Sequence, residues 1–289
     1  MQNKLFISSL VLLCCLVFLS LSIFFSWRIL KNNQKQNIIT VCMPLPDTMT
    51  EQEAQATFEK LTENFEKQYS NYGINLLIYA GDSYEKAFAT QSQDFPTVLI
   101  DIPENQLQNL DLADLAELIK KLDDNYITDM TEFNNFIPLS WSIPVVYTSD
   151  FSITDKILKK ETLPENITQI TNFYDFLENP EINLLSESAN LALIEDYSRT
   201  SGAVRMIPVS ENDNFKIIYH DYCYINANAD KTSQKIGMLW IGYLLSEEAQ
   251  KILFTEHFGN LPLHESAFEM TISQHQGLAI FSEIKGDIA

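Results

Sequence analysis

The chain has 289 residues, and its 39 acidic side chains against 19 basic ones leave a formal net charge of −20. A surface with this charge repels phosphate groups, so we exclude nucleic-acid binding as a function, and docking onto bare anionic lipid is disfavoured too. The acidic residues are scattered and not gathered in blocks, which is typical of the solvated surface of a folded protein. A chain of this length forms one large domain or two small ones.

The N-terminal segment Leu5–Trp27 contains no charged residue, and as a helix its 23 residues would extend for roughly 35 Å, enough to cross a bilayer core. We interpret it as an uncleaved signal anchor, with residues 31–36 as a polar tether. Two alternatives stay open. One is a cleaved secretory signal with a small-x-small site at Ser20-Leu-Ser22, and the other is a lipoprotein signal at Cys14 or Cys15.

Three short apolar runs, at residues 37–43, 74–79 and 95–102, are rich in β-branched and aliphatic side chains and predict buried strands. One helix is predicted between the first two runs, and residues 83–89 predict another before the third. This alternation of strand and helix is a βαβαβ unit, which predicts a mostly parallel sheet covered on both faces.

The first of these helices has a predicted start, face and end. Thr48 and Glu51 have the spacing of a capping box, in which each side chain bonds the backbone N–H of the other residue. Gly73 is expected to close the helix. Its apolar stripe recurs at helical spacing and consists of Phe58, Leu61, Phe65 and Tyr69.

Ligands of open parallel sheets bind outside the carboxyl ends of the strands. Asp47, the turn at residues 81–83 and Asp101 follow those ends directly, so we expect them at a candidate binding site. For Asp47, a role in the turn before the helix is the alternative interpretation. Asp101 ends an apolar strand, and a polar side chain there indicates a surface that faces a cleft.

Later in the chain, residues 107–122 are amphipathic, and residues 215–225 alternate and carry aromatic side chains, which predicts a strand. Within that strand, His220 and Asp221 would point to opposite faces and would be poorly placed to act as a base and its orienting group. The four histidines show no metal-ligand spacing, so no metal site is predicted.

Outside the N-terminal segment, the cysteines Cys42 and Cys223 lie far apart in the sequence, with neither a CxxC pair nor metal-ligand spacing. We interpret them as two buried free thiols. A disulfide between them is the alternative for an exported protein, because sequence alone does not establish their geometry.

Residues 230–263 predict a helix, a break at Ser246-Glu-Glu248, a second helix and a loop with Gly259 and Pro262. Ser246 can cap the second helix, with both glutamates in its positive first turn. The apolar face of the first helix consists of Ile236, Leu239, Trp240, Tyr243 and Leu244, so Trp240 is predicted to lie in the core.

The motif Leu244-Leu-Ser-Glu-Glu-Ala-Gln250, followed by Gly259-Asn-Leu-Pro262, resembles the C-terminal helix pair of bacterial extracellular solute-binding proteins of family 1, the maltose-binding type. The order of elements in the first part and the segment 136–150 are similar to that family too. The resemblance implies an α/β, periplasmic-binding-protein-like fold with two α/β lobes around a cleft, preceded by one N-terminal transmembrane helix.

The resemblance also implies a division of the chain. Residues 1–36 would be the anchor and tether, 37–148 the first lobe, and 149–289 a second lobe whose C-terminal helices return towards the first. About 75 residues separate Asp150 from Tyr224, so the second lobe would be a reduced one. Within it, residues 167–177 are similar to a helix of the family.

Candidate ligand contacts follow from the same resemblance. Trp141 lies in the stretch that faces the interlobe cleft in relatives, where the flat face of a tryptophan can stack on a pyranose ring; core packing is the alternative. Tyr147 falls on a matched position of the segment that crosses between lobes. Asp196, Tyr197 and Arg199 belong to a turn that would reach the cleft.

The function that the resemblance implies is that of the extracellular solute-binding component of an ABC importer, without enzyme activity. It would capture a small solute, with sugars or oligosaccharides as the first expectation, would need no cofactor, and would dock on permease subunits. Two alternatives remain: a membrane-anchored sensing or docking domain without transport, and a membrane-anchored enzyme with an acidic cleft.

The expected location is the cell membrane, crossed once by the N-terminal helix, with the folded domain on the extracellular side. This orientation follows from the resemblance to an exported family. The basic residues alone favour the reverse, because only Lys4 precedes the apolar segment and Arg28, Lys31 and Lys35 follow it.

Overall fold

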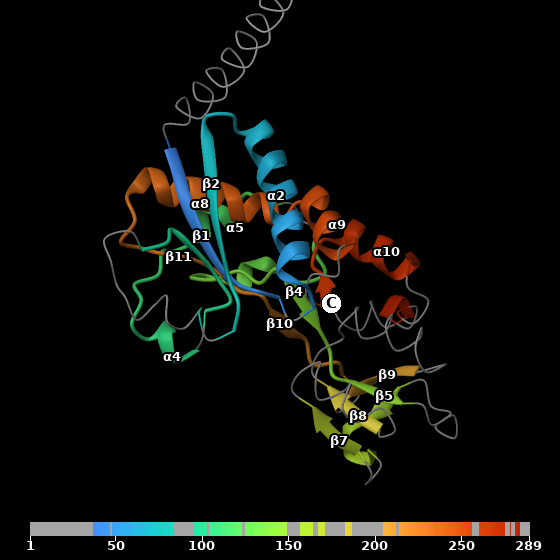
Figure 1. Ribbon diagram of the computed structural model, residues 1–289. Helices are drawn as coiled ribbons and strands as arrows, with labels where there is room; N and C mark the ends of the chain where they lie inside the picture. The colour runs from blue at the N-terminus through green and yellow to red at the C-terminus, as the bar shows by residue number, and fades with distance from the viewer. Residues whose placement is uncertain are drawn as a thin grey trace, which may run out of the picture.

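The protein has two lobes in its computed structural model (Figure 1). A four-stranded sheet forms the first lobe, a five-stranded sheet forms the second, and a three-stranded sheet lies between them. The structure describes residues 37–46, 48–81, 83, 95–102, 104–122, 125–148, 157–163, 167–170, 183–186, 205–211, 214–255, 260–274, 278 and 281–283.

The sheet of the first lobe has the strand order β11-β3-β1-β2. Its central strand β1 (Asn37–Pro44) runs parallel to β2 (Tyr72–Tyr79) and to β3 (Val98–Ile100), as the predicted βαβαβ unit requires. Of the second helix of that unit, predicted at residues 83–89, only Ser83 lies among the described residues. The edge strand β11 (Cys223–Ile225) runs antiparallel to β3. Because β11 follows the second lobe in sequence, the chain returns to complete the first lobe.

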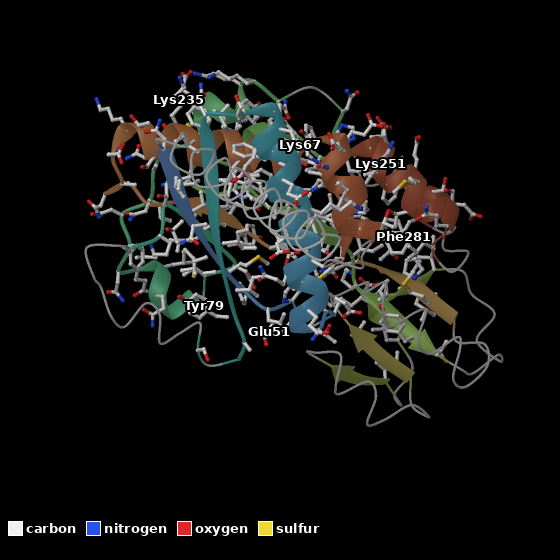
Figure 2. The ribbon with its side chains drawn as sticks, turned by 45° about the horizontal axis from the view of Figure 1, so that its top comes forward. Glu51, Lys67, Tyr79, Lys235, Lys251 and Phe281 are labelled. Carbon is white, nitrogen blue, oxygen red and sulfur yellow. The ribbon has the colours of Figure 1, made fainter. Side chains whose placement is uncertain are left out.

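Helix α2 (Glu51–Gln68) covers this sheet, and Phe58, Leu61 and Phe65 of the predicted stripe are buried. Glutamates in its first turn and Lys67 in its last complement the helix dipole, as Figure 2 shows for Glu51 and Lys67.

The predicted ends of α2 are both wrong. The capping box is Thr50 with Glu53, two residues later than predicted, because the backbone forms a turn in which Met49 N–H donates to Pro46 O (3.0 Å). Thr48 therefore lies before the helix. The helix stops at Gln68, and Gly73 is buried within β2.

The C-terminal helices α8 (Lys231–Leu244) and α9 (Glu247–Thr255) pack on the first lobe beside α2 (Figure 1). Helix α8 lies against β1 and β11, and a Cβ on its Gly237 would come 3.0 Å from a methyl group of Val98 in β3. Trp240 is fully buried, as predicted, and meets Phe65 edge to face at 5.2 Å.

Helix α9 (Glu247–Thr255) follows after the predicted break, and the Ser246 hydroxyl accepts from the Ala249 N–H, as expected of its cap. Glu248 accepts a hydrogen bond from the Asn64 side chain of α2 (2.9 Å). Helix α10 (Glu265–Gln274) packs on α9.

The strand predicted over residues 215–225 is two strands in two sheets. β10 (Ile218–His220) pairs with β4 (Ser140–Ser142), which pairs on its other side with β12 (Leu261–Pro262). Asp221 has a φ of 55° and turns the chain between β10 and β11. Aspartate is one of the few residues that enter this left-handed region at low cost, so alternation along the sequence does not reveal the break.

The amphipathic segment 107–122 consists mostly of irregular backbone. Short helices α4 (Glu104–Leu107) and α5 (Ala116–Ile119) flank a segment in which Leu112 bridges Asn226 and extends the sheet beyond β11. Hydrogen bonds from Ala113 N–H to Ile225 O and from Ala227 N–H to Asp111 O hold this segment at the edge of the sheet. A 3₁₀ turn, η1 (Met130–Glu132), follows.

The five-stranded sheet of the second lobe has the order β6-β9-β5-β8-β7 and includes an outer strand where a helix was expected. β7 occupies the first four residues of the segment 167–177, and the remainder lies outside the described residues. Val146, Ile207 and Val209 belong to its core. The element bounds are β5 (Val145–Thr148), β6 (Leu158–Lys159), η2 (Lys160–Thr162), β7 (Ile167–Ile170), β8 (Asn183–Ser186) and β9 (Arg205–Ser210).

Cys42 and Cys223 are both free and buried, which confirms the free-thiol interpretation. They lie on β1 and β11 with β3 between them, so their backbones are roughly 9–10 Å apart. A disulfide needs Cα atoms closer than about 7 Å. The two side chains also belong to different apolar clusters, on opposite faces of the sheet.

The predicted membrane anchor falls in residues 1–36, which lie outside the described residues. Among the residues that the structure describes, no helix is both long and apolar enough to cross a membrane.

Replacing Gln250 should destabilise the whole protein. Its buried amide donates to the carbonyls of Leu139 and Leu244 and accepts from Leu263 N–H, so Gln250→Leu leaves three buried backbone groups without this partner. We expect a loss of about 3 kcal/mol in the free energy of unfolding. Urea unfolding of the full-length chain measures it. The exposed Gln55→Leu is the matched control, and equal effects of the two would contradict the role of Gln250.

Both thiols should resist modification in the folded protein. Burial raises the pKa of Cys42 to about 12 and that of Cys223 well above its ordinary value, so neither forms a thiolate at pH 8. The test titrates a full-length chain carrying Cys14→Ser and Cys15→Ser with a thiol reagent. We expect no reaction when it is folded and two thiols in denaturant without reductant. No thiols in denaturant would indicate a disulfide.

Candidate functional site

The carboxyl end of β1 points towards the side on which the second lobe lies (Figure 1), and β3 runs parallel to β1. Asp101 comes directly after β3 and is exposed there. Its backbone is left-handed, with a φ of 52°, and its N–H donates to Tyr222 O (2.7 Å). A residue other than glycine in this conformation is uncommon and often marks a functional position, so the structure puts Asp101 where a ligand site is expected.

Three aromatic rings gather at the same end of β3. Tyr222 and Tyr224 flank Cys223 and therefore point to one face of β11. Phe136 enters from the segment that bridges Cys223, and its ring lies 5.2 Å from that of Tyr222 and 6.1 Å from that of Tyr224. Phe136 keeps 37% of its surface exposed, so part of this aromatic cluster is open to a ligand.

The negative charge of Asp101 contributes to a raised pKa at both Tyr222 and Tyr224. Burial, and then the nearby Asp101 carboxylate, raise the pKa of Tyr224 to about 12, and burial is also the main cause of a raised pKa at Tyr222. Both phenols stay protonated at neutral pH and can donate hydrogen bonds. A carboxylate, phenol donors and aromatic faces together suit a polar solute with apolar C–H surfaces.

The described connections between the lobes lie next to this cluster. One leads from β4 to β5 and another from β9 to β10, and β4 and β10 are paired to each other. Ser142 Oγ and His220 Nε2 lie 2.8 Å apart, and the Ser140 hydroxyl donates to Asp221. These bonds hold the two chain segments together where they leave the first lobe.

The expectation that His220 and Asp221 point to opposite faces is therefore wrong, because both reach serines of β4. The left-handed backbone at Asp221 breaks the strand alternation. The Ser142–His220 pair nevertheless lacks the access that a nucleophile needs, since Ser142 is fully buried. Burial lowers the pKa of His220 to about 4, so the pair is an uncharged hydrogen bond within the junction.

The structure does not bring the other expected contacts to this site. Trp141 is fully buried, its indole N–H donates to Pro262 O (2.9 Å), and its ring packs on Phe268 and Phe281. It thus packs in the core, which was the alternative interpretation, and its ring cannot stack on a sugar in this conformation. Tyr147 is buried in β5.

The remaining sequence candidates, Asp47, Asp196, Tyr197 and Arg199, lie outside the described residues. The aromatic cluster was missed as a site because its members are separated in the sequence. The i, i+2 spacing of Tyr222 and Tyr224 does predict that both rings lie on one face of a strand. That this strand pairs with β3, beside Asp101, is seen only in the structure.

No protein-family model matches the sequence, and no curated protein matches it either. Solved structures do resemble it. A maltodextrin-binding protein of L. casei is 11% identical with a TM-score of 0.61, over 87% of this chain and 86% of that chain. The fold is that of periplasmic solute-binding proteins. An ABC transporter solute-binding protein of Thermotoga lettingae, bound with α-D-tagatose, is 10% identical with a TM-score of 0.58, over 86% and 87%.

An enzyme shares this fold as well. A eukaryotic thiaminase-I bound to 3-deazathiamin is 12% identical with a TM-score of 0.54, over 87% of this chain and 93% of that chain. The fold therefore does not by itself decide between binding and catalysis. Within the described part of the chain, no group of three or more His, Cys, Asp or Glu side chains is placed to hold a metal ion.

His220 should make stability fall as the pH is lowered. Its pKa is about 4 when folded against an ordinary 6.5, so between these values the unfolded chain binds a proton that the folded chain does not. The free energy of unfolding should lose up to about 3 kcal/mol across this window. His220→Gln keeps a donor for Ser142 but cannot titrate. Urea unfolding at pH 4 to 7 should show a shallower slope for this variant, and parallel curves would contradict the assignment.

Proposed function

We propose that this protein is the solute-binding component of an ABC importer, and that it captures a small solute between its lobes. The observation that carries the proposal is the placement of Asp101 and the aromatic cluster. They lie at the carboxyl ends of parallel strands, beside the connections to the second lobe, in a fold shared with solute-binding proteins.

Sugars or oligosaccharides are the ligand class we propose. Two of the structures with this fold are a maltodextrin-binding protein and a tagatose complex. The chemistry at Asp101 agrees with this class, because a carboxylate accepts from sugar hydroxyls while an exposed ring such as Phe136 covers C–H groups. Asp47, Asp196 and Tyr197 complete the proposed contact set.

The membrane and the permease are further parts of the proposal. The apolar segment Leu5–Trp27 would anchor the protein, with the folded domain outside the cell. An anchored binder stays at a high local concentration near permease subunits, so loaded protein would meet them often. Closure of the two lobes around the solute, by a hinge at the β4–β5 and β9–β10 connections, would be the signal for docking.

Catalysis is the second candidate function, because a thiaminase-I shares the fold. Among the described residues, the Ser142–His220 pair has the atoms of a nucleophile and its base at 2.8 Å, but Ser142 is fully buried. A conformational change that uncovers Ser142 would be required for it to attack a substrate. Turnover of a bound compound, abolished by Ser142→Ala with binding retained, would establish this candidate in place of simple binding.

A thermal-shift screen tests solute binding. The full-length chain, in a detergent without a sugar headgroup, is titrated with maltose, maltotriose and D-tagatose. At a free concentration 100 times its dissociation constant, a solute that binds only the folded state stabilises the protein by about 2.7 kcal/mol. This corresponds to a rise in Tm of roughly 5 °C or more.

Asp101→Asn should weaken this binding about tenfold or more, because the lost charge accepted hydrogen bonds from the solute. Asp114→Asn, on an exposed residue that keeps its cap to Ala116 N–H, is the matched control and should bind like the wild type. If none of the sugars raises Tm, the sugar class is wrong. If both variants bind like the wild type, the Asp101 site is not the solute site.

A further inference from the structure

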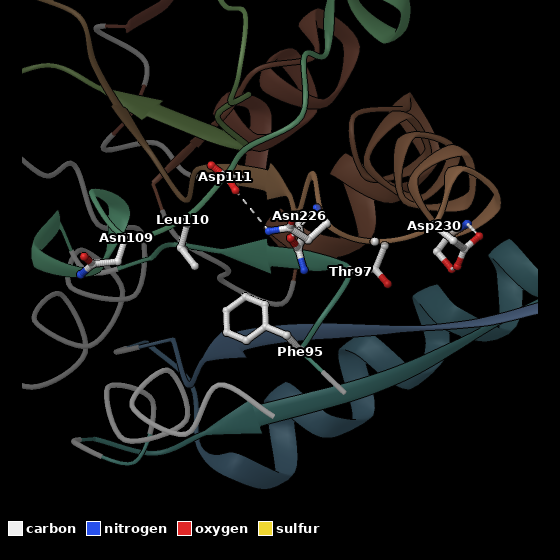
Figure 3. A pocket seen from close by; sticks show the side chains of 10 residues that line it. Phe95, Thr97, Asn109, Leu110, Asp111, Asn226 and Asp230 are labelled. Atoms are coloured by element: carbon white, nitrogen blue, oxygen red, sulfur yellow. Dashed lines mark hydrogen bonds between the residues drawn. The ribbon is translucent and has the colours of Figure 1, made fainter. Parts of the chain in front are cut away.

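The first lobe also contains a cavity that lies away from the candidate site at Asp101. It is a cavity of about 680 Å³ at the amino end of β3, where Phe95 and Thr97 precede the strand and Asn226 follows the antiparallel β11 (Figure 3). The segment with Asp111 and the start of α8 with Asp230 complete its wall. A cavity of this size has room for a small molecule.

This cavity and the Asp101 site are separate. Thr97 and Asp101 lie at opposite ends of β3, roughly 13 Å apart along an extended chain. The three-residue strand β3 and its buried side chains lie between them. A ligand in the cavity would therefore occupy the first lobe alone and would not bridge to the second.

Several donors of the lining are engaged with acceptors of the protein itself. The side-chain amide of Asn228 donates to Asp111 (3.4 Å, Figure 3), that of Asn226 to Pro96 O (3.4 Å), and the Ser233 hydroxyl to Asp230 (2.6 Å). Each of these three groups thus directs one N–H or O–H to an acceptor of the protein, whereas the carboxylates of Asp111 and Asp230 can only accept. A carboxylate accepts about four hydrogen bonds, so Asp111 retains capacity after its bond to Asn228.

All the charged side chains that line the cavity are acidic. The lining contains the carboxylates of Asp111 and Asp230 and no basic side chain. Hydrogen bonds from Ser233 lower the pKa of Asp230, so that carboxylate stays ionised. The whole protein is strongly negative as well, which raises the local concentration of cations and repels anions. Figure 3 shows the ring of Phe95 at the same opening, where an aromatic face attracts a cation.

We propose that this cavity is a second ligand site, which binds a small organic ammonium ion through Asp111 and the neighbouring acceptors, with Phe95 against the cation. An ammonium group donates three hydrogen bonds and accepts none, which complements the carboxylates of Asp111 and Asp230. This site is independent of the solute site at Asp101 and does not require that the protein be a transporter.

The probe is 1,4-diaminobutane, titrated calorimetrically into the full-length chain, with 1,4-butanediol as its uncharged counterpart. We expect the diamine to bind at least about tenfold more tightly than the diol, since hydrogen bonds to a charged group contribute a factor of this order. Equal binding of the two, or no binding of the diamine, would overturn the proposal.

Variants then locate the bound diamine. Asp111→Asn keeps the shape of the side chain and removes its charge, and it should weaken the diamine about tenfold. Asp114→Asn, three residues further on and outside the lining, should change the affinity less than about twofold. Equal losses in both variants would mean attraction to the acidic surface in general. A loss in Asp101→Asn and not in Asp111→Asn would place the diamine in the solute site and overturn the second site.

Discussion

The buried amide of Gln250 is the interaction on which the arrangement of this protein depends. It accepts from Leu263 N–H and donates to Leu139 O and Leu244 O, so one side chain connects α9 to the segment before β4, to the end of α8 and to the loop after β12. Backbone groups in the interior need partners, and here no regular ladder provides them. The side chain thus sets the position of β4 relative to the C-terminal helices.

Strand β4 in turn connects the core to the junction between the lobes. Trp141, at its centre, fills the space between the three-stranded sheet and α10. Its neighbours Ser140 and Ser142 hold Asp221 and His220 on β10. The left-handed residue Asp221 then redirects the chain into β11, and this brings Tyr222 and Tyr224 to Asp101. The candidate site therefore depends on the core packing of Trp141 and β4, which cannot be inferred from the residues of the site themselves.

The two ends of β3 offer different chemistry. At its carboxyl end an exposed carboxylate lies near aromatic rings and phenol donors. At its amino end the lining is polar and negative, and it belongs to the first lobe alone.

The sequence by itself determined the local elements and the family resemblance. The strands β1 and β2, the apolar stripe of α2, the helix pair around Ser246 and the burial of Trp240 follow from periodicity and capping, which are properties of neighbouring residues. Tertiary structure decided the rest. Leu112 pairs with Asn226, more than a hundred residues away, and the aromatic cluster consists of residues from two separate segments. These outcomes depend on hydrogen bonds and packing between residues far apart in the chain, whose free energy outweighs local preference and leaves no period in the sequence.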